Sequence, residues 1–190
     1  MRPSDVMRLF KGCGAWMEGH FVLSSGLHSR EYLQCALVLE HPTLAARVCG
    51  ALAERFMGDE VTCVVGPALG GILVSYEVAR HLGARSLFAE RVDGRLQLRR
   101  GFHISSKDRV LVMEDVVTTG GSAEELIQRV QDTGATVVGV GALVDRSSGW
   151  VSFDVKFHAL LSVDAKTFQA ADCPSCKEGV PLSQPGSRGL

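Results

Sequence analysis

The sequence predicts an α/β domain with a mostly parallel sheet flanked by helices. Apolar strand patterns and amphipathic helix patterns alternate along most of the chain, as they do when parallel strands are joined by right-handed helical crossovers. The chain has 190 residues, of which 46% are hydrophobic and 22% are charged. A chain of this length and composition can bury one core of ordinary size, so we expect a single domain.

The expected elements follow one another in a regular order. A short helix at residues 4–10 precedes two extended segments, 20–26 and 30–39, which meet at a Ser-Gly turn. Helices are then expected at 42–57, from the Gly-rich segment 66–71 to 81, and from about 122 to a stop at Gly134. Strands are expected at 61–65, 85–90, 110–113 and 136–144.

Charge and hydropathy exclude several classes of protein. The 20 Lys and Arg residues are balanced by 21 Asp and Glu residues, which argues against a general nucleic-acid binder. The N-terminal segment lacks a signal-peptide core, and no apolar run approaches the roughly 18 residues that a membrane span needs. We therefore expect a cytoplasmic protein with no membrane partner.

The six cysteines are scattered, and most lie in apolar segments, as reduced buried cysteines do. Only Cys173 and Cys176 have the spacing of metal ligands. Because a structural zinc usually has four ligands and no second such pair is present, a plain reduced pair is the favoured interpretation. A zinc shared across a dimer is the alternative.

Three segments with unusual composition follow expected strands, at residues 66–71, 114–122 and 145–149. If the strands are parallel, these segments lie together at one edge of the sheet, where ligands of such folds bind. The pattern therefore predicts one ligand site at this edge.

The segment "VLVMEDVVTTGGSAEELI" (110–127) carries the strongest functional signal. Backbone N–H groups of the Thr118–Ser122 stretch can form an anion nest at the start of a helix, and hydroxyl groups add donors. The preceding Glu114 and Asp115 suit ribose hydroxyls or hydrated Mg²⁺. Ser122 and Glu125 match a capping box at the start of the following helix. The alternative for the segment is a glycine-rich turn with an ordinary N-cap.

This segment resembles the phosphoribosyl pyrophosphate (PRPP) motif of the type I phosphoribosyltransferases. Four further segments resemble the orotate phosphoribosyltransferase family in register and in order, namely "GHFVLSSGLHSREYLQ", "GPALGG", "FAERVDGRLQLRRGF" and "LVDRSSG". The resemblance covers roughly residues 5–182. It implies the type I phosphoribosyltransferase fold, with a small N-terminal hood formed mainly by residues 1–40 and a core at about 41–165. The Pro-, Ser- and Gly-rich tail at 183–190 is expected from its composition to be disordered.

The resemblance also implies an activity. The chain is expected to be a glycosyltransferase (pentosyltransferase) that moves phosphoribosyl from PRPP to orotate, giving orotidine 5′-monophosphate and pyrophosphate in de novo pyrimidine (UMP) biosynthesis. Mg²⁺ is the expected cofactor, held mainly through PRPP and water, and the expected assembly is a homodimer. A phosphoribosyltransferase for another base and a PRPP-sensing regulator of the same fold are the alternatives.

The resemblance assigns roles by position. Arg146, helped by Thr118, is expected to pair with orotate; without the resemblance, a surface ion pair with Asp145 would explain Arg146 equally well. The residues expected to bind PRPP are Glu114, Asp115, Val116, Val117, Thr118, Thr119, Gly120, Gly121, Ser122, Ala68, Leu69, Gly70 and Gly71.

Two segments depart from the family pattern. Ser24 stands where many members have a lysine, and the loop that commonly carries a Lys and His pair is here rich in arginine. Arg91 and Arg95 are the catalytic candidates in this loop. Arg99 and Arg100 are assigned instead to the return strand of a hairpin that turns at Asp93-Gly94, and a simple solvated hairpin is the alternative for the whole segment.

Overall fold

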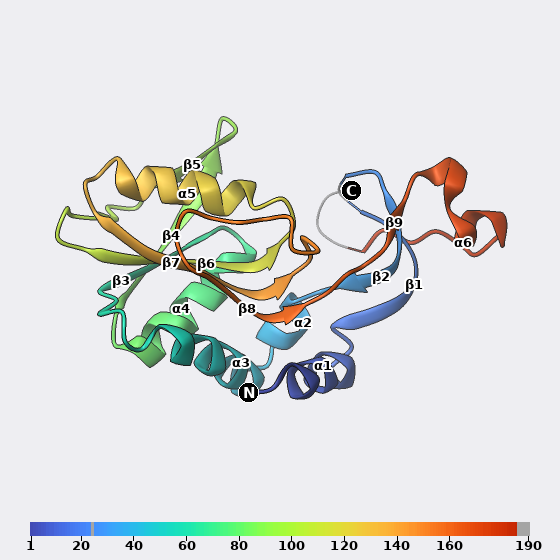
Figure 1. Ribbon diagram of the computed structural model, residues 1–190, viewed down its shortest axis with the longest axis horizontal. Helices are drawn as coiled ribbons and strands as arrows, with labels where there is room; N and C mark the ends of the chain where they lie inside the picture. Colours follow the sequence, from blue (N-terminus) through green and yellow to red (C-terminus); the bar gives the residue numbers. More distant parts are fainter. Residues whose placement is uncertain (24, 186–190) are drawn as a thin grey trace.

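A six-stranded sheet forms the centre of the computed structural model, which describes residues 1–23 and 25–185 (Figure 1). The strand order is β5-β4-β3-β6-β7-β8, and only the edge strand β5 runs antiparallel to its neighbour. The strands are β3 (Cys63–Pro67), β4 (Arg85–Val92), β5 (Arg95–Leu98), β6 (Arg109–Val117), β7 (Thr136–Asp145) and β8 (Phe157–Ser162). The predicted fold class is confirmed.

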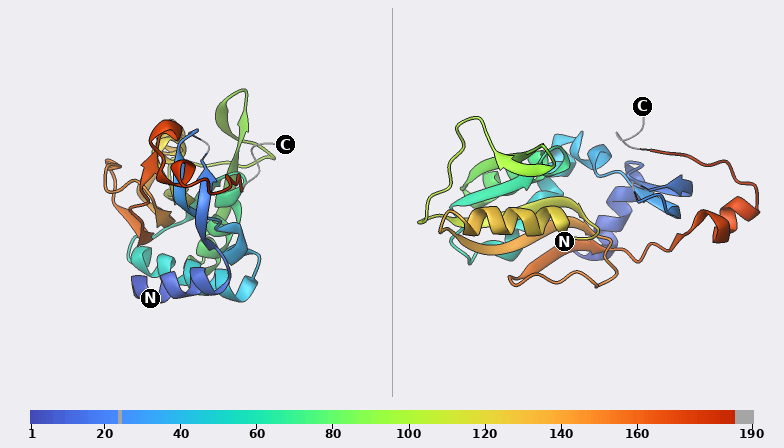
Figure 2. Two further views of the ribbon diagram at one scale, coloured as in Figure 1. Left: turned by 90° about the vertical axis from the view of Figure 1, so that its right-hand side faces the viewer. Right: turned by 90° about the horizontal axis from the view of Figure 1, so that it is seen from above.

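Helices cover both faces of this sheet (Figures 1 and 2). One face packs against α3 (Pro42–Ala53), its 3-10 extension η1 (Glu54–Phe56) and α4 (Gly70–Leu82), and the other packs against α5 (Gly121–Gln131). Strand β6 shows why two cores form. Leu111 and Met113 belong to the first core, whereas Val110 and Val112 belong to the second, because successive side chains of a strand point to opposite faces.

The hood is a smaller antiparallel sheet beside the main one. It follows α1 (Pro3–Gly12) and contains β1 (Trp16–Val22), β2 (His28–Leu33) and the short β9 (Thr167–Phe168). Chain from near the C-terminus therefore contributes a strand to a unit that the sequence assigns mainly to residues 1–40. The prediction of extended chain over 30–39 is wrong at its end, because Ala36–Leu39 forms the helix α2 and buries Val38 and Leu39.

The C-terminal segment continues from β9 along the hood. It forms η2 (Ala170–Asp172) and α6 (Pro174–Lys177), and then returns to β1, where the Ser183 N–H donates to the His20 carbonyl oxygen at 2.8 Å. The Ser183 carbonyl oxygen accepts from the Val22 N–H at 3.0 Å. The prediction of a disordered tail is therefore wrong at Ser183, which is held by backbone hydrogen bonds. Residues 186–190 of that tail lie outside the described residues.

Several element boundaries differ from the prediction. Strand β3 begins at Cys63 rather than residue 61, and β6 continues to Val117, so the acidic pair lies within the strand instead of after it. The predicted capping box of Ser122 and Glu125 is wrong, because the N-cap of α5 is Gly120, with no side-chain cap hydrogen bond. Across the described part of the chain, no helix is both long and apolar enough to cross a membrane.

Candidate functional site

Glu114 and Asp115 lie near the carboxyl end of β6, in the middle of the sheet edge where the sequence predicts a site. Both side chains are half-buried. Burial raises the pKa of Glu114 to about 8, and the adjacent Asp115 charge adds to this effect, while the Arg91 charge opposes it. Burial also raises the pKa of Asp115, whose Oδ1 accepts from the Val116 N–H at 3.0 Å. Two acids that are costly to ionise are suited to a ligand that brings cations or hydroxyl donors.

The segment from Thr118 to Ser122 leads from β6 into the first turn of α5, where free backbone N–H groups of a helix can bind an anion. Gly120 adopts a left-handed conformation, with φ of 77°, which glycine tolerates best. Behind it, a Cβ at this position would meet the Val151 side chain at 2.9 Å. Thr118 and Thr119 are exposed, so their hydroxyl groups are accessible at the positive end of the α5 dipole.

The loop that contains Ala68, Leu69, Gly70 and Gly71 joins β3 to α4 and approaches the acidic pair directly. A Cβ on Gly70 would collide with the Asp115 carboxylate. Leu69, which is the N-cap of α4, is largely exposed. The approach of backbone to carboxylate brings the first two predicted segments together and explains why position 70 requires glycine.

Arg146 follows β7, and its backbone N–H donates to the Val117 carbonyl oxygen at 2.8 Å, which joins the third segment to the second. Its Nε is buried and has no hydrogen-bond partner among the described residues. The alternative ion pair with Asp145 does not form in the described structure, where Asp145 Oδ1 accepts from the Ser147 N–H at 2.8 Å. Because a buried unpaired donor is costly, Arg146 is suited to an anionic ligand.

The hood contributes Tyr32, which sequence reasoning did not select. Burial raises the pKa of Tyr32, and the charge of Arg146 opposes that shift while the charge of Asp115 adds to it. Tyr32 therefore lies in the electrostatic environment of both residues. In the sequence, Tyr32 could have been selected only from its place in the hood segment "SREYLQ", and other polar residues of that segment are equally plausible site residues. The hood position of Ser24 lies outside the described residues.

The arginine-rich segment forms the predicted hairpin of β4 and β5, which turns at Asp93-Gly94 and projects beyond the helix layer (Figures 1 and 2). The placement of Arg99 and Arg100 in its return strand is wrong, because β5 ends at Leu98. Arg91 Nη1 donates to the Gly94 carbonyl oxygen at 2.6 Å and pairs with Glu125 Oε2 at 3.1 Å. Arg100 pairs with Glu90. The backbone of Arg95 pairs with Val92 across the hairpin, whereas its side chain makes no hydrogen bond or ion pair with any residue in the described ranges.

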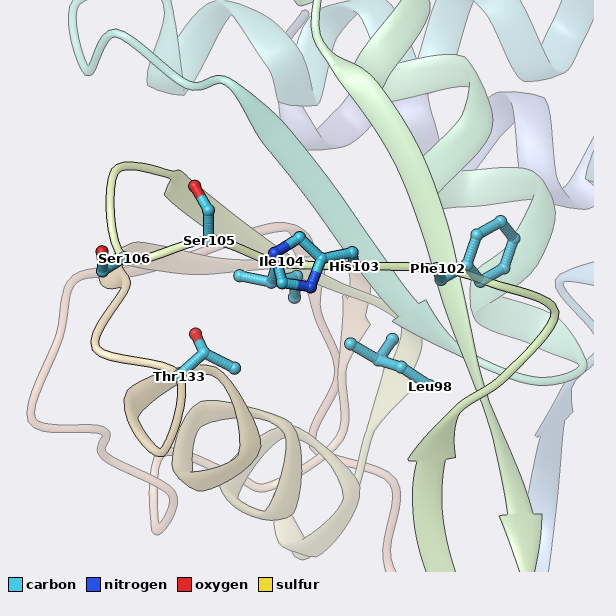
Figure 3. A pocket seen from close by; sticks show the side chains of 7 residues that line it. All are labelled: Leu98, Phe102, His103, Ile104, Ser105, Ser106 and Thr133. Carbon is cyan, nitrogen blue, oxygen red and sulfur yellow. The ribbon is translucent and has the colours of Figure 1, made fainter.

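A pocket of about 550 Å³ lies elsewhere, between the β5–β6 connection and the end of α5 (Figure 3). It is lined by Leu98, Phe102, His103, Ile104, Ser105, Ser106 and Thr133. None of these residues is a predicted site residue, and none is a carboxylate, arginine or lysine. We therefore place the functional site at the sheet edge, where the acidic pair and Arg146 lie, and not in this pocket.

Comparisons with known proteins decide the family. The phosphoribosyl transferase domain family matches residues 36–174. An orotate phosphoribosyltransferase of Pelotomaculum thermopropionicum is 52% identical over 190 residues, which is 100% of both chains. The chain belongs to the orotate phosphoribosyltransferase family. Another relative with this name, from Thermotoga maritima, is 50% identical over 97% of this chain and 99% of its own.

Solved structures agree with the assignment of the fold. The orotate phosphoribosyltransferase from Aeropyrum pernix superimposes with a TM-score of 0.70 at 25% identity, covering 83% of this chain and 93% of that one. The adenine phosphoribosyltransferase from Rhodothermus marinus reaches a TM-score of 0.66 at 26% identity, covering 84% and 99%. The same fold therefore accommodates different bases, and selectivity must come from individual side chains.

The predicted site residues fall into two groups in space. The acidic pair, the Thr118–Ser122 segment, the Ala68–Gly71 loop and Arg146 meet at one edge of the sheet. Within the motif, Val117 is buried and Val116 half-buried, so both contribute mainly backbone to this edge. Arg91 pairs with Glu125 of α5, and its charge acts to lower the pKa of Glu114, but it does not contact this group directly. Arg95 lies on the hairpin, away from the group.

Proposed function

We propose that this chain transfers the phosphoribosyl group from PRPP to N1 of orotate, forming orotidine 5′-monophosphate and pyrophosphate for de novo UMP synthesis. The observation that carries this proposal is the buried Nε of Arg146, which has no partner in the described part of the chain and lies beside the glycine-rich start of α5 and an acidic pair. A guanidinium can bind the orotate carboxylate bidentately. Relatives named orotate phosphoribosyltransferase at 48–52% identity support the same substrate.

Each segment of the site then has a distinct task. The backbone N–H groups and hydroxyls from Thr118 to Ser122 bind the 5′-phosphate, and Glu114 with Asp115 binds the ribose hydroxyls. Backbone N–H groups of the Ala68–Gly71 loop approach the pyrophosphate, aided by the positive end of α4. Arg146 and Thr118 orient orotate so that N1 faces C1 of the ribose.

The reaction requires charge stabilisation more than proton transfer. As the C1–oxygen bond to pyrophosphate breaks and the N1–C1 bond forms, positive charge develops on the ribose ring and negative charge on the leaving group. Glu114 and Asp115 would hold the hydration shell of a Mg²⁺ ion that arrives with PRPP, and the bound ion would supply positive charge to that leaving group. A hairpin arginine adds a second positive charge when the hairpin closes.

We also propose that the active form is a cytoplasmic homodimer. Helix α4 leaves Leu69, Leu73 and Tyr76 exposed at 79%, 50% and 60%, at the spacing of one helical face. This apolar stripe begins in the loop next to the acidic pair, so a second copy seated on it would lie beside the site. The arrangement suits a hairpin that reaches over the PRPP of the neighbouring subunit.

The test is the decrease in orotate absorbance when purified protein is mixed with orotate, PRPP and Mg²⁺. The proposal predicts stoichiometric formation of orotidine 5′-monophosphate and pyrophosphate, both dependent on Mg²⁺. Adenine, hypoxanthine and uracil, tested in parallel, address the alternative of another base. Turnover of one of these bases without orotate consumption would refute the proposal, and PRPP binding without turnover of any base would favour the regulatory alternative.

A further inference from the structure

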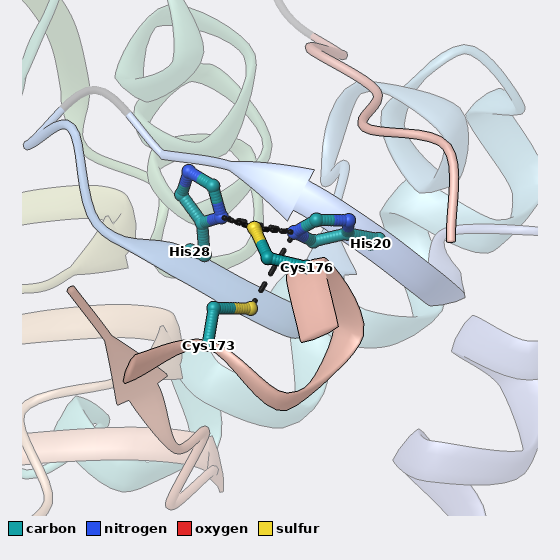
Figure 4. A group of neighbouring side chains, drawn as sticks. All are labelled: His20, His28, Cys173 and Cys176. Carbon is teal, nitrogen blue, oxygen red and sulfur yellow. Dashed lines mark hydrogen bonds between the residues drawn. The ribbon is translucent and has the colours of Figure 1, made fainter. Parts of the chain in front are cut away.

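Four side chains from two distant parts of the sequence converge on the outer side of the hood (Figure 4). His20 and His28 come from the adjacent strands β1 and β2, while Cys173 and Cys176 come from the start and body of α6. One ligand atom from each residue lies within 4.8 Å of the other three. None of the four belongs to the phosphoribosyltransferase site described above.

We propose that these four residues form a structural Zn²⁺ site that fastens the C-terminal segment to the hood. Two thiolates and two imidazoles are a ligand set that tetrahedral zinc takes in proteins. The Cys-Pro-Ser-Cys spacing presents both sulfur atoms from one short turn, as in zinc knuckles. Because all four positions are filled by protein, no coordination position is left for a substrate, which favours a structural role over a catalytic one.

The distances fit this geometry. With zinc–nitrogen bonds near 2.0–2.1 Å and zinc–sulfur bonds near 2.3 Å, a tetrahedron places a nitrogen about 3.6 Å from a sulfur. The Sγ of Cys176 lies 3.3 Å from His28 Nδ1 and 3.6 Å from His20 Nε2, and the Sγ of Cys173 lies 3.5 Å from His20 Nε2. The two nitrogens are 2.9 Å apart and need to separate by only about 0.4 Å.

A backbone contact orients one of the ligands. His20 Nδ1 lies 2.8 Å from the Val180 carbonyl oxygen, to which its N–H donates, so the lone pair of Nε2 faces the cluster. Metal-bound histidines almost always have such an outer partner, which fixes the tautomer and the ring orientation. Val180 belongs to the same C-terminal segment that carries both cysteines, so this contact supports the geometry from outside the cluster.

The surroundings show what the metal would hold. His20, His28 and Cys173 are almost fully buried, although the hood has few large apolar side chains to bury with them. On the surface, Arg30 of β2 pairs with Glu178 at 2.8 Å and donates to Ser175 Oγ at 3.2 Å. Exposed ion pairs contribute little to stability, so the His and Cys cluster is the strongest candidate for the interaction that attaches this segment to the hood.

Two alternatives use the same residues. In a hydrogen-bonded cluster, one imidazole donates to the other and the thiols add only weak hydrogen bonds. These bonds compensate poorly for the free energy lost when four polar groups are removed from water. In a redox pair, Cys173 and Cys176 form a disulfide. Zinc satisfies all four groups at once and requires no oxidant.

The test is metal content and spectroscopy on the full-length protein, purified under reducing conditions. The proposal predicts about one Zn²⁺ per chain. After chelation, added Co²⁺ should give the visible absorption of a tetrahedral ion together with a thiolate-to-cobalt charge-transfer band. Thermal unfolding should occur at a lower temperature in the chelated protein and recover when Zn²⁺ is restored.

Variants assign the ligands. Cys176 is exposed, so Cys176→Ser should leave the fold intact, weaken Zn²⁺ binding by more than about 100-fold and reduce the charge-transfer band by about half. His28→Gln should weaken Zn²⁺ binding but keep the full charge-transfer band, because both thiolates remain. Cys13→Ser, which changes a half-buried thiol outside the cluster, is the matched control and should bind Zn²⁺ as the wild type does.

Three results would overturn the proposal. The first is freshly reduced wild-type protein that binds no stoichiometric Zn²⁺. The second is a Cys176→Ser protein that binds Zn²⁺ as tightly as the Cys13→Ser control. The third is a Cys173–Cys176 disulfide found by mass spectrometry in protein purified anaerobically. None of these readouts depends on phosphoribosyl transfer, so the zinc site and the proposed enzyme activity can fail separately.

Discussion

Arg91 on the β4–β5 hairpin pairs with Glu125 on α5, with 3.1 Å between Nη1 and Oε2. The other oxygen of the same carboxylate, Oε1, accepts from the Leu96 backbone N–H at 2.6 Å. Glu125 therefore holds both strands of the hairpin against α5, the helix that follows the proposed phosphate-binding segment. This relationship separates the two arginines that the sequence offers as catalytic candidates. The Arg91 side chain is engaged within its own chain, whereas the Arg95 side chain has no partner among the described residues.

We expect Arg95 to be the charge donor and Arg91 to position the hairpin. Arg95→Ala should lower kcat by roughly 100-fold, as loss of one donor to transition-state charge does. Arg91→Ala should cost less, and its effect should resemble that of Glu125→Gln because both changes release the same contact. Steady-state kinetics with orotate and PRPP measure this, with Arg99→Ala as the control. Equal losses for Arg95→Ala and Arg99→Ala would contradict the assignment.

Mixed dimers test whether the hairpin acts on the neighbouring subunit. When Arg95→Ala protein is mixed with Asp115→Asn protein, a mixed dimer has one subunit with an intact cradle facing an intact hairpin. With random one-to-one mixing, about half of the dimers are mixed. Activity should then recover toward about a quarter of the wild-type value per subunit. Verified mixed dimers without recovery would show that each hairpin serves its own subunit.

The raised pKa of Glu114 predicts a pH dependence of stability. Between the usual value of 4.5 and about 8, folded protein keeps a proton on Glu114 that the unfolded chain has released. Stability should therefore fall as pH rises through this range, by at most about 1.4 kcal/mol per pH unit. Glu114→Gln should flatten this slope in urea unfolding measured from pH 5 to pH 8. The exposed Glu124→Gln is the control, and identical slopes for the wild type and Glu114→Gln would refute this prediction.

Arg146, whose buried Nε has no partner among the residues that the structure describes, predicts selectivity for a carboxylated base. Arg146→Ala should reduce kcat/KM for orotate roughly 30-fold to 1000-fold, which corresponds to a loss of about 2 to 4 kcal/mol of transition-state stabilisation. Uracil lacks the carboxylate, so Arg146→Ala should change kcat/KM for uracil far less. Arg146→Lys should recover only part of the loss because an ammonium cannot form the planar bidentate pair. If Arg146 has a structural role instead, Arg146→Ala should lower kcat/KM for orotate and for uracil by the same factor.

The apolar stripe of α4 predicts the dimer interface. Leu73→Glu combined with Tyr76→Glu should weaken dimerisation by at least about 30-fold, because the change buries charge in the centre of an interface. Analytical ultracentrifugation measures the dissociation constant. Met57→Glu places a charge at another exposed apolar residue, 72% exposed and outside the stripe, and should leave the dimer intact. A wild-type protein that sediments as a monomer at assay concentration would rule out this interface.

Local patterns in the sequence determined the fold class and the alternation of helices and strands from α3 to β7, and they selected the segments that meet at the sheet edge. They did not predict α2, β8, β9 or α6. The strands of the sheet are buried on both faces and read as short apolar runs, and the helices between them have clear periodicity. The Glu114–Ser122 motif is contiguous, so its chemistry could be recognised before any tertiary contact was known. The β4–β5 hairpin was also predictable, because Asp93 and Gly94 both adopt positive φ in its turn.

Only the tertiary structure decided which distant residues meet. The sequence shows Cys173 and Cys176 as a pair without partners, and the fold supplies His20 and His28 from a hairpin about 150 residues earlier by pairing β9 with β2. In the same way, Gly70 is recognised as a packing requirement only when its backbone lies against Asp115. Sequence periodicity reports which face of an element is buried, but contacts between elements depend on the strand order and on how the hood folds back over the sheet.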